Sequence, residues 1–173
     1  MGVEIERKFL VDQEKWEQVI KPQGTHYRQG YVLNEAKRTL RVRVTDKQGY
    51  ITFKGPTDGI TRKEYEYKIP VEDGTELLNG FAIAEVEKIR YRIPFEGHLW
   101  EVDEFLGDSE GLIMAEIELL HENDEFTLPA WISYEVSGDV RYYNSYLSTH
   151  PFKKWSREPV SPKDQETENH NLK

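Results

Sequence analysis

Acidic and basic side chains occupy every second position in several short segments of this sequence. The first segment, VEIERKF at residues 3–9, places Glu4, Glu6 and Lys8 between mostly apolar neighbours. Such alternation is typical of a β-strand, because successive side chains of a strand point to opposite faces of the sheet. The three charges would therefore share one face. In a single strand, the same pattern is also typical of the solvated face of an ordinary antiparallel sheet.

Six further segments repeat the alternation, and their charges come in blocks of one sign. Solvated sheet faces usually mix positive and negative side chains. Grouped carboxylates repel one another unless a divalent cation relieves the repulsion, and grouped arginines and lysines suit a bound polyanion. Together the segments favour a metal and polyanion site over a solvated face. They are LRVRV with Arg41 and Arg43, ITFK with Thr52 and Lys54, KEYEYK with Glu64, Glu66 and Lys68, EKIRYRI with Lys88, Arg90 and Arg92, WEVDEF with Glu101 and Asp103, and AEIEL with Glu116 and Glu118.

A closed β-barrel with its polar side inward would bring these charged faces together. Closure removes exposed sheet edges, and a barrel of about eight strands leaves room for a small ligand. The apolar faces would then point outward and would need helices to cover them. The sequence predicts one helix over residues 12–20 with Asp12 as its cap, and a second around residues 74–85. A third is expected from Ser137 or Asp139 to just before Pro151.

Composition limits the classes of function. The 173 residues suit a single domain, and we expect it to span residues 1–155, with a polar, flexible tail over 156–173. Cysteine is absent, so any metal would have oxygen or histidine ligands. Ser137 and Ser145 lack the surroundings of a catalytic serine, so capping or solvent contact is the expected role of each.

Charge and hydropathy limit the partners and the compartment. The net charge of −9 argues against non-specific nucleic-acid binding. No apolar stretch approaches the ~20 residues of a membrane span, and no secretion signal is recognisable at the start. We therefore expect no membrane partner and a cytoplasmic location. Whether the chain is a monomer or a homodimer stays open, because outward apolar strand faces could pack against its own helices or a second subunit.

The ordered set of segments resembles the CYTH superfamily, also called triphosphate tunnel metalloenzymes. EIERKFLV matches the Glu-x-Glu-x-Lys signature of that family. Further similar segments are RQGYV, RVR, TFKG, KEYEY, EKIRYRI, WEVDEF, AEIEL and EVSGDVRYYNSYL, so the resemblance covers about residues 1–150. It implies an α+β fold built on a closed antiparallel eight-stranded β-barrel, whose polar lumen binds a triphosphate and a divalent metal, Mg²⁺ or Mn²⁺.

The resemblance also implies roles for individual residues. Carboxylate oxygens suit a hard cation, and guanidinium groups grip phosphate in a bidentate way. Glu64 and Glu66 would join the metal network or orient the clamp arginines, and Arg92 and Lys68 would sit at the tunnel mouths. The metal side comprises Glu4, Glu6, Asp103, Glu116 and Glu118, the phosphate clamp comprises Lys8, Arg41, Arg43, Lys54, Lys88 and Arg90, and the water-activating pair comprises Tyr31 and Lys88.

The implied reaction is hydrolysis of inorganic triphosphate to diphosphate and phosphate. Two other activities of the same superfamily stay open, namely adenylate cyclisation and hydrolysis of thiamine or nucleoside triphosphates. A module that binds polyphosphate without turnover is a third alternative. The acidic set weakens this third alternative, because capture of an anion needs only cations.

Overall fold

The computed structural model describes residues 2–155, so the predicted tail over 156–173 lies outside the described residues. Within them, the strands are β1 (Gly2–Val11), β2 (Thr25–Glu35), β3 (Arg38–Val44), β4 (Gly49–Asp58), β5 (Thr61–Ile69), β6 (Ala84–Phe95), β7 (His98–Phe105), β8 (Ile113–Glu118) and β9 (Ile132–Glu135). The helices are α1 (Gln13–Glu17), α2 (Val71–Phe81) and α3 (Asn144–Leu147), with 3₁₀ turns η1 (Gly107–Ser109), η2 (Val140–Tyr142) and η3 (Phe152–Lys154).

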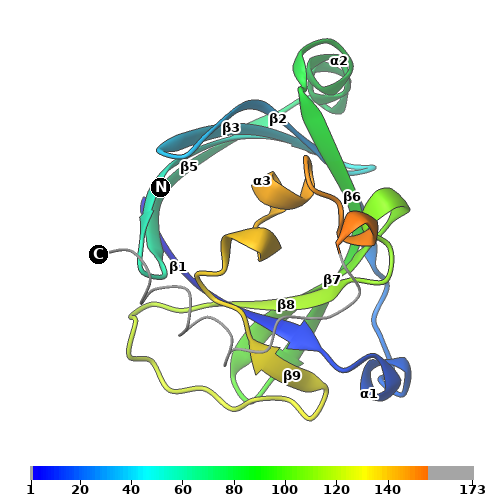
Figure 1. Cartoon of the computed structure of the whole chain (residues 1–173), viewed down its shortest axis with the longest axis vertical. Helices are drawn as coiled ribbons and strands as arrows, with labels where there is room; N and C mark the ends of the chain where they lie inside the picture. Colours follow the sequence, from blue (N-terminus) through cyan, green and yellow to red (C-terminus); the bar gives the residue numbers. More distant parts are fainter. Residues whose placement is uncertain (1, 156–173) are drawn as a thin grey trace.

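Eight of the strands in residues 2–155 close into an antiparallel barrel (Figure 1). Their order is β5-β4-β3-β2-β6-β7-β8-β1, and the pairing of β1 with β5 completes the ring. The predicted closed eight-stranded barrel is thereby confirmed. The charge alternation indicated seven of these strands. It did not indicate β2, where only the family resemblance pointed to RQGYV, or β9, which pairs with the second half of β1.

The register of the strands brings the opposite charges of neighbouring strands together. Lys8 of β1 faces Glu116 of β8, and Lys54 of β4 faces Glu64 of β5. Arg90 of β6 faces Asp103 of β7 in the same way. Directly opposed side chains on one sheet face are in contact range, so blocks of one sign on single strands become mixed pairs across the barrel.

The outward face of β1, β7 and β8 is covered by an aromatic core under α1, β9 and the segment after β8. Trp16 of α1 is 1% exposed and packs edge-on against Trp131 and Tyr91. Asp12 caps α1 by accepting a 3.1 Å hydrogen bond from the Lys15 backbone N–H, as predicted. The helix is shorter than the predicted 12–20, because its last turn closes at Gln18, whose backbone N–H donates to the Lys15 carbonyl at 3.1 Å.

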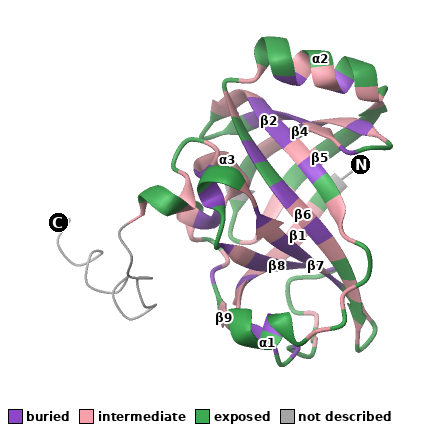
Figure 2. Ribbon diagram, turned by 90° about the vertical axis from the view of Figure 1, so that its right-hand side faces the viewer, coloured by how far each residue is buried: buried purple, intermediate pink, exposed green. Residues whose placement is uncertain are grey.

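Helix α2 packs on the outside of β2, β3 and β4 (Figure 2). The contact is close. A Cβ atom on Gly30 of β2 would lie 2.7 Å from a Leu78 methyl group, and one on Gly74 would lie 2.7 Å from Val44. The helix spans 71–81 rather than about 74–85, because Pro70 provides its N-terminal start and β6 begins at Ala84.

The third predicted helix is wrong in both form and place. Residues 137–150 form the turn η2 and the four-residue helix α3 instead of one helix, because Tyr143 between them has extended backbone. Asp139 does cap η2, as predicted, and its side chain accepts a hydrogen bond from the Arg141 backbone N–H. We call residues 136–147 the C-terminal strap. It lies across the barrel in Figure 1 instead of covering an outward face. The inward side chains at this end are apolar, and Tyr142 and Leu147 pack against Phe105 and Met114.

The strap is tied to two opposite walls of the barrel. The Val136 N–H donates to the Lys8 carbonyl of β1 at 2.8 Å, and the Asn34 side chain of β2 donates to the Ser145 carbonyl at 3.0 Å. Three strands separate β1 from β2 on either side of the ring. The strap therefore spans the diameter of the barrel. The lumen was predicted to be polar, and it is polar except where apolar side chains pack against the strap. In the described part of the chain, no helix has the length and apolar character needed to cross a bilayer.

Candidate active site

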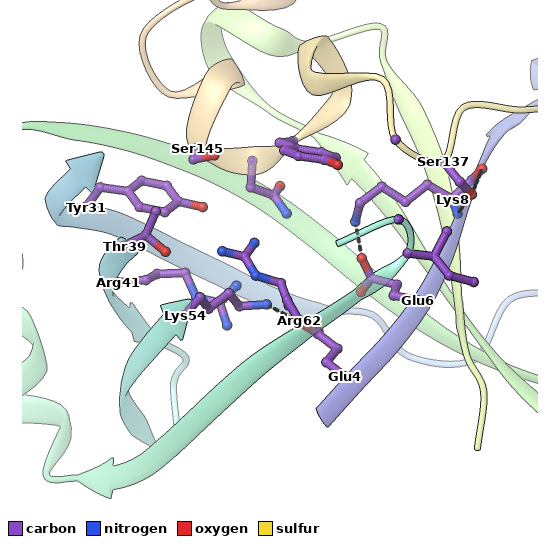
Figure 3. A pocket seen from close by; sticks show the side chains of 15 residues that line it. Glu4, Glu6, Lys8, Tyr31, Thr39, Arg41, Lys54, Arg62, Ser137 and Ser145 are labelled. Carbon is purple, nitrogen blue, oxygen red and sulfur yellow. Dashed lines mark hydrogen bonds and ion pairs between the residues drawn. The ribbon is translucent and has the colours of Figure 1, made fainter. Parts of the chain in front are cut away.

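A cavity that is partly open to solvent lies in the lumen beside the strap (Figure 3). Six residues predicted from the sequence line it, namely Glu4, Glu6, Lys8, Tyr31, Arg41 and Lys54. Sequence reasoning missed the other wall residues, or gave them no role in binding. These are Thr39, Gly59, Ile60, Arg62, Ser137, Gly138, Tyr143, Asn144 and Ser145.

Lys8 lies between two carboxylates on the β1–β8 wall. Its Nζ atom forms ion pairs with Glu6 and, at 2.5 Å, with Glu116. Burial disfavours the Lys8 charge, but Glu116 and Glu6 outweigh burial and raise its pKa. Burial likewise opposes ionisation of Glu116, yet the Lys8 and Arg90 charges hold the Glu116 pKa well below its ordinary value. Lys8 and Glu116 therefore keep their charges at neutral pH.

Lys54 of β4 joins β1 to β5, on the side of β1 that is away from β8. Its Nζ atom lies 2.8 Å from Glu4 and 2.5 Å from Glu64. Burial acts to raise the Glu64 pKa, but a hydrogen bond with Glu4 and the Lys54 charge outweigh burial. The Glu64 pKa therefore lies below its ordinary value. Glu64 thus contacts both a predicted metal ligand and a predicted clamp lysine.

A second buried cluster is centred on Asp103. Both of its oxygens accept hydrogen bonds, from Lys88 Nζ at 2.5 Å and from Arg90 Nε and Nη2 at 2.6 and 2.7 Å. Arg90 also reaches Glu116 at 2.8 Å and pairs with Glu101. Burial and the neighbouring Arg90 charge lower the Lys88 pKa to about 8. Lys88 and Arg90 do not line the cavity themselves.

The two clamp arginines of β3 share Glu66. Arg43 Nη2 lies 3.1 Å from both Glu66 oxygens, and Arg41 Nη2 lies 3.6 Å from one of them. The Arg43 guanidinium also lies over the rings of Tyr27 and Tyr50. Glu66 therefore contacts both predicted clamp arginines, and its expected role in orienting them stays a prediction. Arg92 and Lys68 are both exposed, and Arg92 pairs with Glu101 at 2.9 Å.

Tyr31 of β2 lies in the cavity wall and is 4% exposed. Burial raises its pKa, although the Arg41 and Lys8 charges act in the opposite direction. In the described chain no hydrogen bond joins Tyr31 to Lys88, which is bonded to Asp103. The structure thus places the two members of the predicted water-activating pair on adjacent strands without direct contact.

The predicted metal-binding carboxylates share one wall, with Glu6 directly opposite Glu118 across β1 and β8. Burial and the nearby acidic groups Glu4 and Glu6 raise the Glu118 pKa, and burial and Glu116 raise that of Glu6. Over residues 2–155, however, no three acidic or histidine side chains are arranged as a ready-made metal site. Most of these oxygens contact lysine or arginine instead. Their chemistry still fits a hard cation such as Mg²⁺ or Mn²⁺.

The sequence analysis missed two kinds of cavity residue, and a sequence pattern could have identified only one of them. Arg62 stands two residues before Glu64, so the alternation of β5 already places it on the lumen face. By contrast, Tyr143, Asn144 and Ser145 reach the cavity only because the strap crosses the barrel. No local periodicity reports such a long-range arrangement.

Comparisons with known proteins agree with this geometry. The CYTH domain model matches residues 2–149. An inorganic triphosphatase from Acetivibrio thermocellus is 50% identical over 154 residues, which make up 88% of this chain and 97% of the relative. An inorganic triphosphatase from Nitrosomonas europaea is 35% identical over 154 residues, which make up 84% and 96% of the two chains.

Solved structures have the same architecture. That of an inorganic triphosphatase has a TM-score of 0.58 at 31% identity, covering 83% of this chain and 96% of its own. A protein from Pyrococcus horikoshii, at 23% identity and a TM-score of 0.54, covers 69% of this chain and 80% of its own and supports the fold alone. On the family model and the two sequence relatives together, this chain belongs to the CYTH domain family.

Proposed function

We propose that this chain is a metal-dependent inorganic triphosphatase that hydrolyses tripolyphosphate to diphosphate and phosphate in the barrel cavity. One observation carries the proposal. Cations from four different strands, namely Lys8, Arg41, Lys54 and Arg62, line a single cavity together with Glu4 and Glu6. A polyanion that also carries a metal ion is the ligand that can satisfy both sets of charges.

The substrate is held by the cationic side chains. Arg41 and Arg43 project from β3, and planar guanidinium groups can each contact two phosphate oxygens. Lys8 and Lys54 add point charges from β1 and β4. Lys88 and Arg90 stand behind the cavity wall and contribute positive potential there. Glu64 and Glu66 keep Lys54 and the β3 arginines in place through ion pairs.

Glu4, Glu6, Glu116 and Glu118 are the residues that would hold Mg²⁺ or Mn²⁺. When bound, such an ion neutralises phosphate charge and favours attack by water on the terminal phosphoryl group. Burial and the nearby carboxylates raise the Glu118 pKa, and a bound cation would favour its charged form. Asp103 is the least suited of the predicted ligands, because both of its oxygens bind Lys88 and Arg90.

Tyr31 and Lys88 remain the proposed pair for proton transfer. The Lys88 pKa of about 8 makes a neutral amine accessible slightly above neutral pH. Burial raises the Tyr31 pKa, so the phenol by itself stays protonated at neutral pH. Because no direct hydrogen bond joins the pair, the proposal requires bound substrate or water to link them.

Phosphate release from tripolyphosphate, ATP and thiamine triphosphate, each with Mg²⁺ or Mn²⁺, tests the proposal. We expect tripolyphosphate to have the highest kcat/KM by a large factor. Strong preference for a nucleoside or thiamine triphosphate would overturn the inorganic assignment, and cyclic AMP as the main product from ATP would assign a cyclase. Tight binding of tripolyphosphate without turnover by any metal would identify a binding module.

A further inference from the structure

We propose that Gln29 is a positioning residue, whose buried carboxamide binds a water molecule and through it links Tyr31 to Lys88. This inference rests on the proposed triphosphatase function. It supplies the link that the proposed proton-transfer pair requires. Gln29 belongs neither to the predicted metal side nor to the predicted phosphate clamp, and it carries no charge.

Gln29 points into the barrel from the middle of β2. Gly30, the next residue, faces outward, because a Cβ atom there would lie 2.7 Å from a methyl group of Leu78 on the outer helix α2. Successive side chains of a strand alternate, so Gln29 shares the inner face with Tyr31, which lies in the cavity wall (Figure 3). The register shift of β2 lies beyond Tyr31 and leaves this alternation intact. Gln29 is therefore the neighbour of a cavity residue.

Gln29 also lies between the two members of the pair. In the register of β2 and β6, Gln29 faces Val86, and Lys88 stands two residues further along β6 on the same face. Diagonal neighbours of this kind lie about 7–8 Å apart, within reach of long side chains. Tyr31 stands on the other side of Gln29, opposite Ala84. A hydrogen-bonded path along the inner wall from Tyr31 to Lys88 therefore passes Gln29.

The hydrogen-bonding groups of Gln29 are unused in the described chain. Gln29 is 0% exposed, and within residues 2–155 neither its Oε1 nor its Nε2 atom has a hydrogen-bond partner. Thr52 and Asp103, which are also 0% exposed, both form hydrogen bonds. Buried polar groups without partners are rare and costly, and ordered water commonly supplies the partner. The Gln29 carboxamide is thus suited to hold a buried water.

Neighbouring side chains can hold the same water. Gln29 faces Arg43 across β2 and β3, and the Nε–H groups of Arg41 and Arg43 are also buried without an acceptor. A buried water usually makes about three hydrogen bonds. The carboxamide can supply one, an arginine N–H a second and the Tyr31 hydroxyl a third. Such a water fixes the direction of the hydroxyl, whose hydrogen otherwise rotates to any available acceptor.

Lys88 needs an intermediary to act on the cavity. It is 2% exposed, and it does not line the cavity itself. A lysine ammonium group has three N–H donors, and Asp103 accepts one of them at 2.5 Å. Lys88 can therefore bind a water held by Gln29 without leaving Asp103. The carboxamide suits this position because it can donate and accept at once.

Steady-state kinetics of Gln29→Met, Gln29→Asn and Gln18→Met test the role of the carboxamide. Methionine has a similar length but holds water poorly, so we expect kcat for tripolyphosphate to fall roughly 10- to 100-fold while KM stays within about 3-fold. Asparagine keeps the carboxamide and should recover part of kcat. Gln18→Met makes the same change at the exposed end of α1 and should match wild type. Wild-type kcat in Gln29→Met, or a change in KM alone, would overturn the assignment.

The same substitution in Tyr31→Phe, measured above pH 7, separates positioning from a general effect on the fold. A residue that acts through the Tyr31 hydroxyl has nothing left to position in Tyr31→Phe, so Gln29→Met should cause little further loss of kcat there. Equal fold losses in the two backgrounds would overturn the proposal, as would wild-type kcat in Tyr31→Phe.

Melting temperatures of all variants identify any that is destabilised, and Gln29→Asn replaces Gln29→Met in the comparison if the latter folds poorly. Wild-type protein that hydrolyses no tripolyphosphate with either metal would instead contradict the proposed function. The two failures are therefore distinguishable.

Discussion

At the scale of single residues, Lys88 is a buried lysine whose surroundings disfavour its positive charge. Burial and Arg90 lower its pKa from 10.5 to about 8. Between these values the unfolded chain binds more protons than the folded chain, so the contribution of Lys88 to the free energy of unfolding rises with pH across this window. A bound polyanion favours the charged form. We therefore expect KM for tripolyphosphate to increase as the pH rises through about 8.

The proton-transfer pair gives a separate prediction for kcat. If Tyr31 and Lys88 activate water, kcat rises above pH 7, and Tyr31→Phe abolishes that rise while KM stays within about 3-fold of wild type. Measuring kcat and KM from pH 6 to pH 10 checks both parts. Tyr67→Phe, at an exposed position of the outer barrel wall, is the matched control. A Tyr31→Phe enzyme with the wild-type rate and profile would leave the tyrosine with a packing role.

Glu118 tests the metal side of the site. Glu118→Gln should lower kcat at least about 10-fold, because the amide keeps the shape but loses the charge that attracts a cation. The raised Glu118 pKa means that its ionised form is disfavoured in the folded chain at neutral pH. The variant should therefore melt at or slightly above the wild-type temperature. Glu125→Gln, in the exposed segment after β8, should change neither property. Wild-type turnover by Glu118→Gln, or in excess chelator, would contradict the assignment.

At the scale of elements, the strands were predictable and the strap was not. Alternation in segments such as residues 3–9 fixes both the strand and its lumen face, because a one-residue shift would bury the charges on the wrong side. Leu10 and Met114 continue the inward-facing sets of β1 and β8, yet they are apolar. These two apolar residues could have indicated that one end of the lumen is packed against another segment of the chain. Nothing local in residues 136–147 shows that the strap fills that space.

The strap gives a prediction about stability. Leu147 is 1% exposed in the core between the strap and the inner barrel wall. Leu147→Ala should lower the free energy of unfolding by about 2–5 kcal/mol, through lost burial and the cavity that remains. Val140, 57% exposed in the same strap, provides the control, and Val140→Ala should cost less than about 0.5 kcal/mol. Urea unfolding of both variants measures the difference. Equal stability would show that the strap packs loosely.

At the scale of the whole molecule, the lumen is a set of mutually neutralising charges. Lys8, Lys54 and Arg90 each bind two or more carboxylates in the ligand-free chain. A metal ion that takes carboxylates leaves the cations unpaired, and a triphosphate that takes cations leaves the carboxylates unpaired. Removing one partner of a buried pair is costly, whereas supplying both ligands satisfies both sets. The two ligands should therefore bind with positive coupling.

Thermal unfolding can measure this coupling. A ligand that binds the folded state stabilises it by RT ln(1 + [L]/Kd), so independent ligands give additive increments in stability. We expect Mg²⁺ alone and a non-hydrolysable imido analogue of triphosphate alone to raise the melting temperature modestly. Together they should raise it by clearly more than the sum, because each ligand releases the groups that the other needs. In Glu118→Gln the excess should shrink, since the metal side is weakened while the cations are unchanged. Strictly additive shifts in the wild-type protein would mean that the ion pairs of the lumen persist when the ligands bind, and that metal and triphosphate occupy it independently.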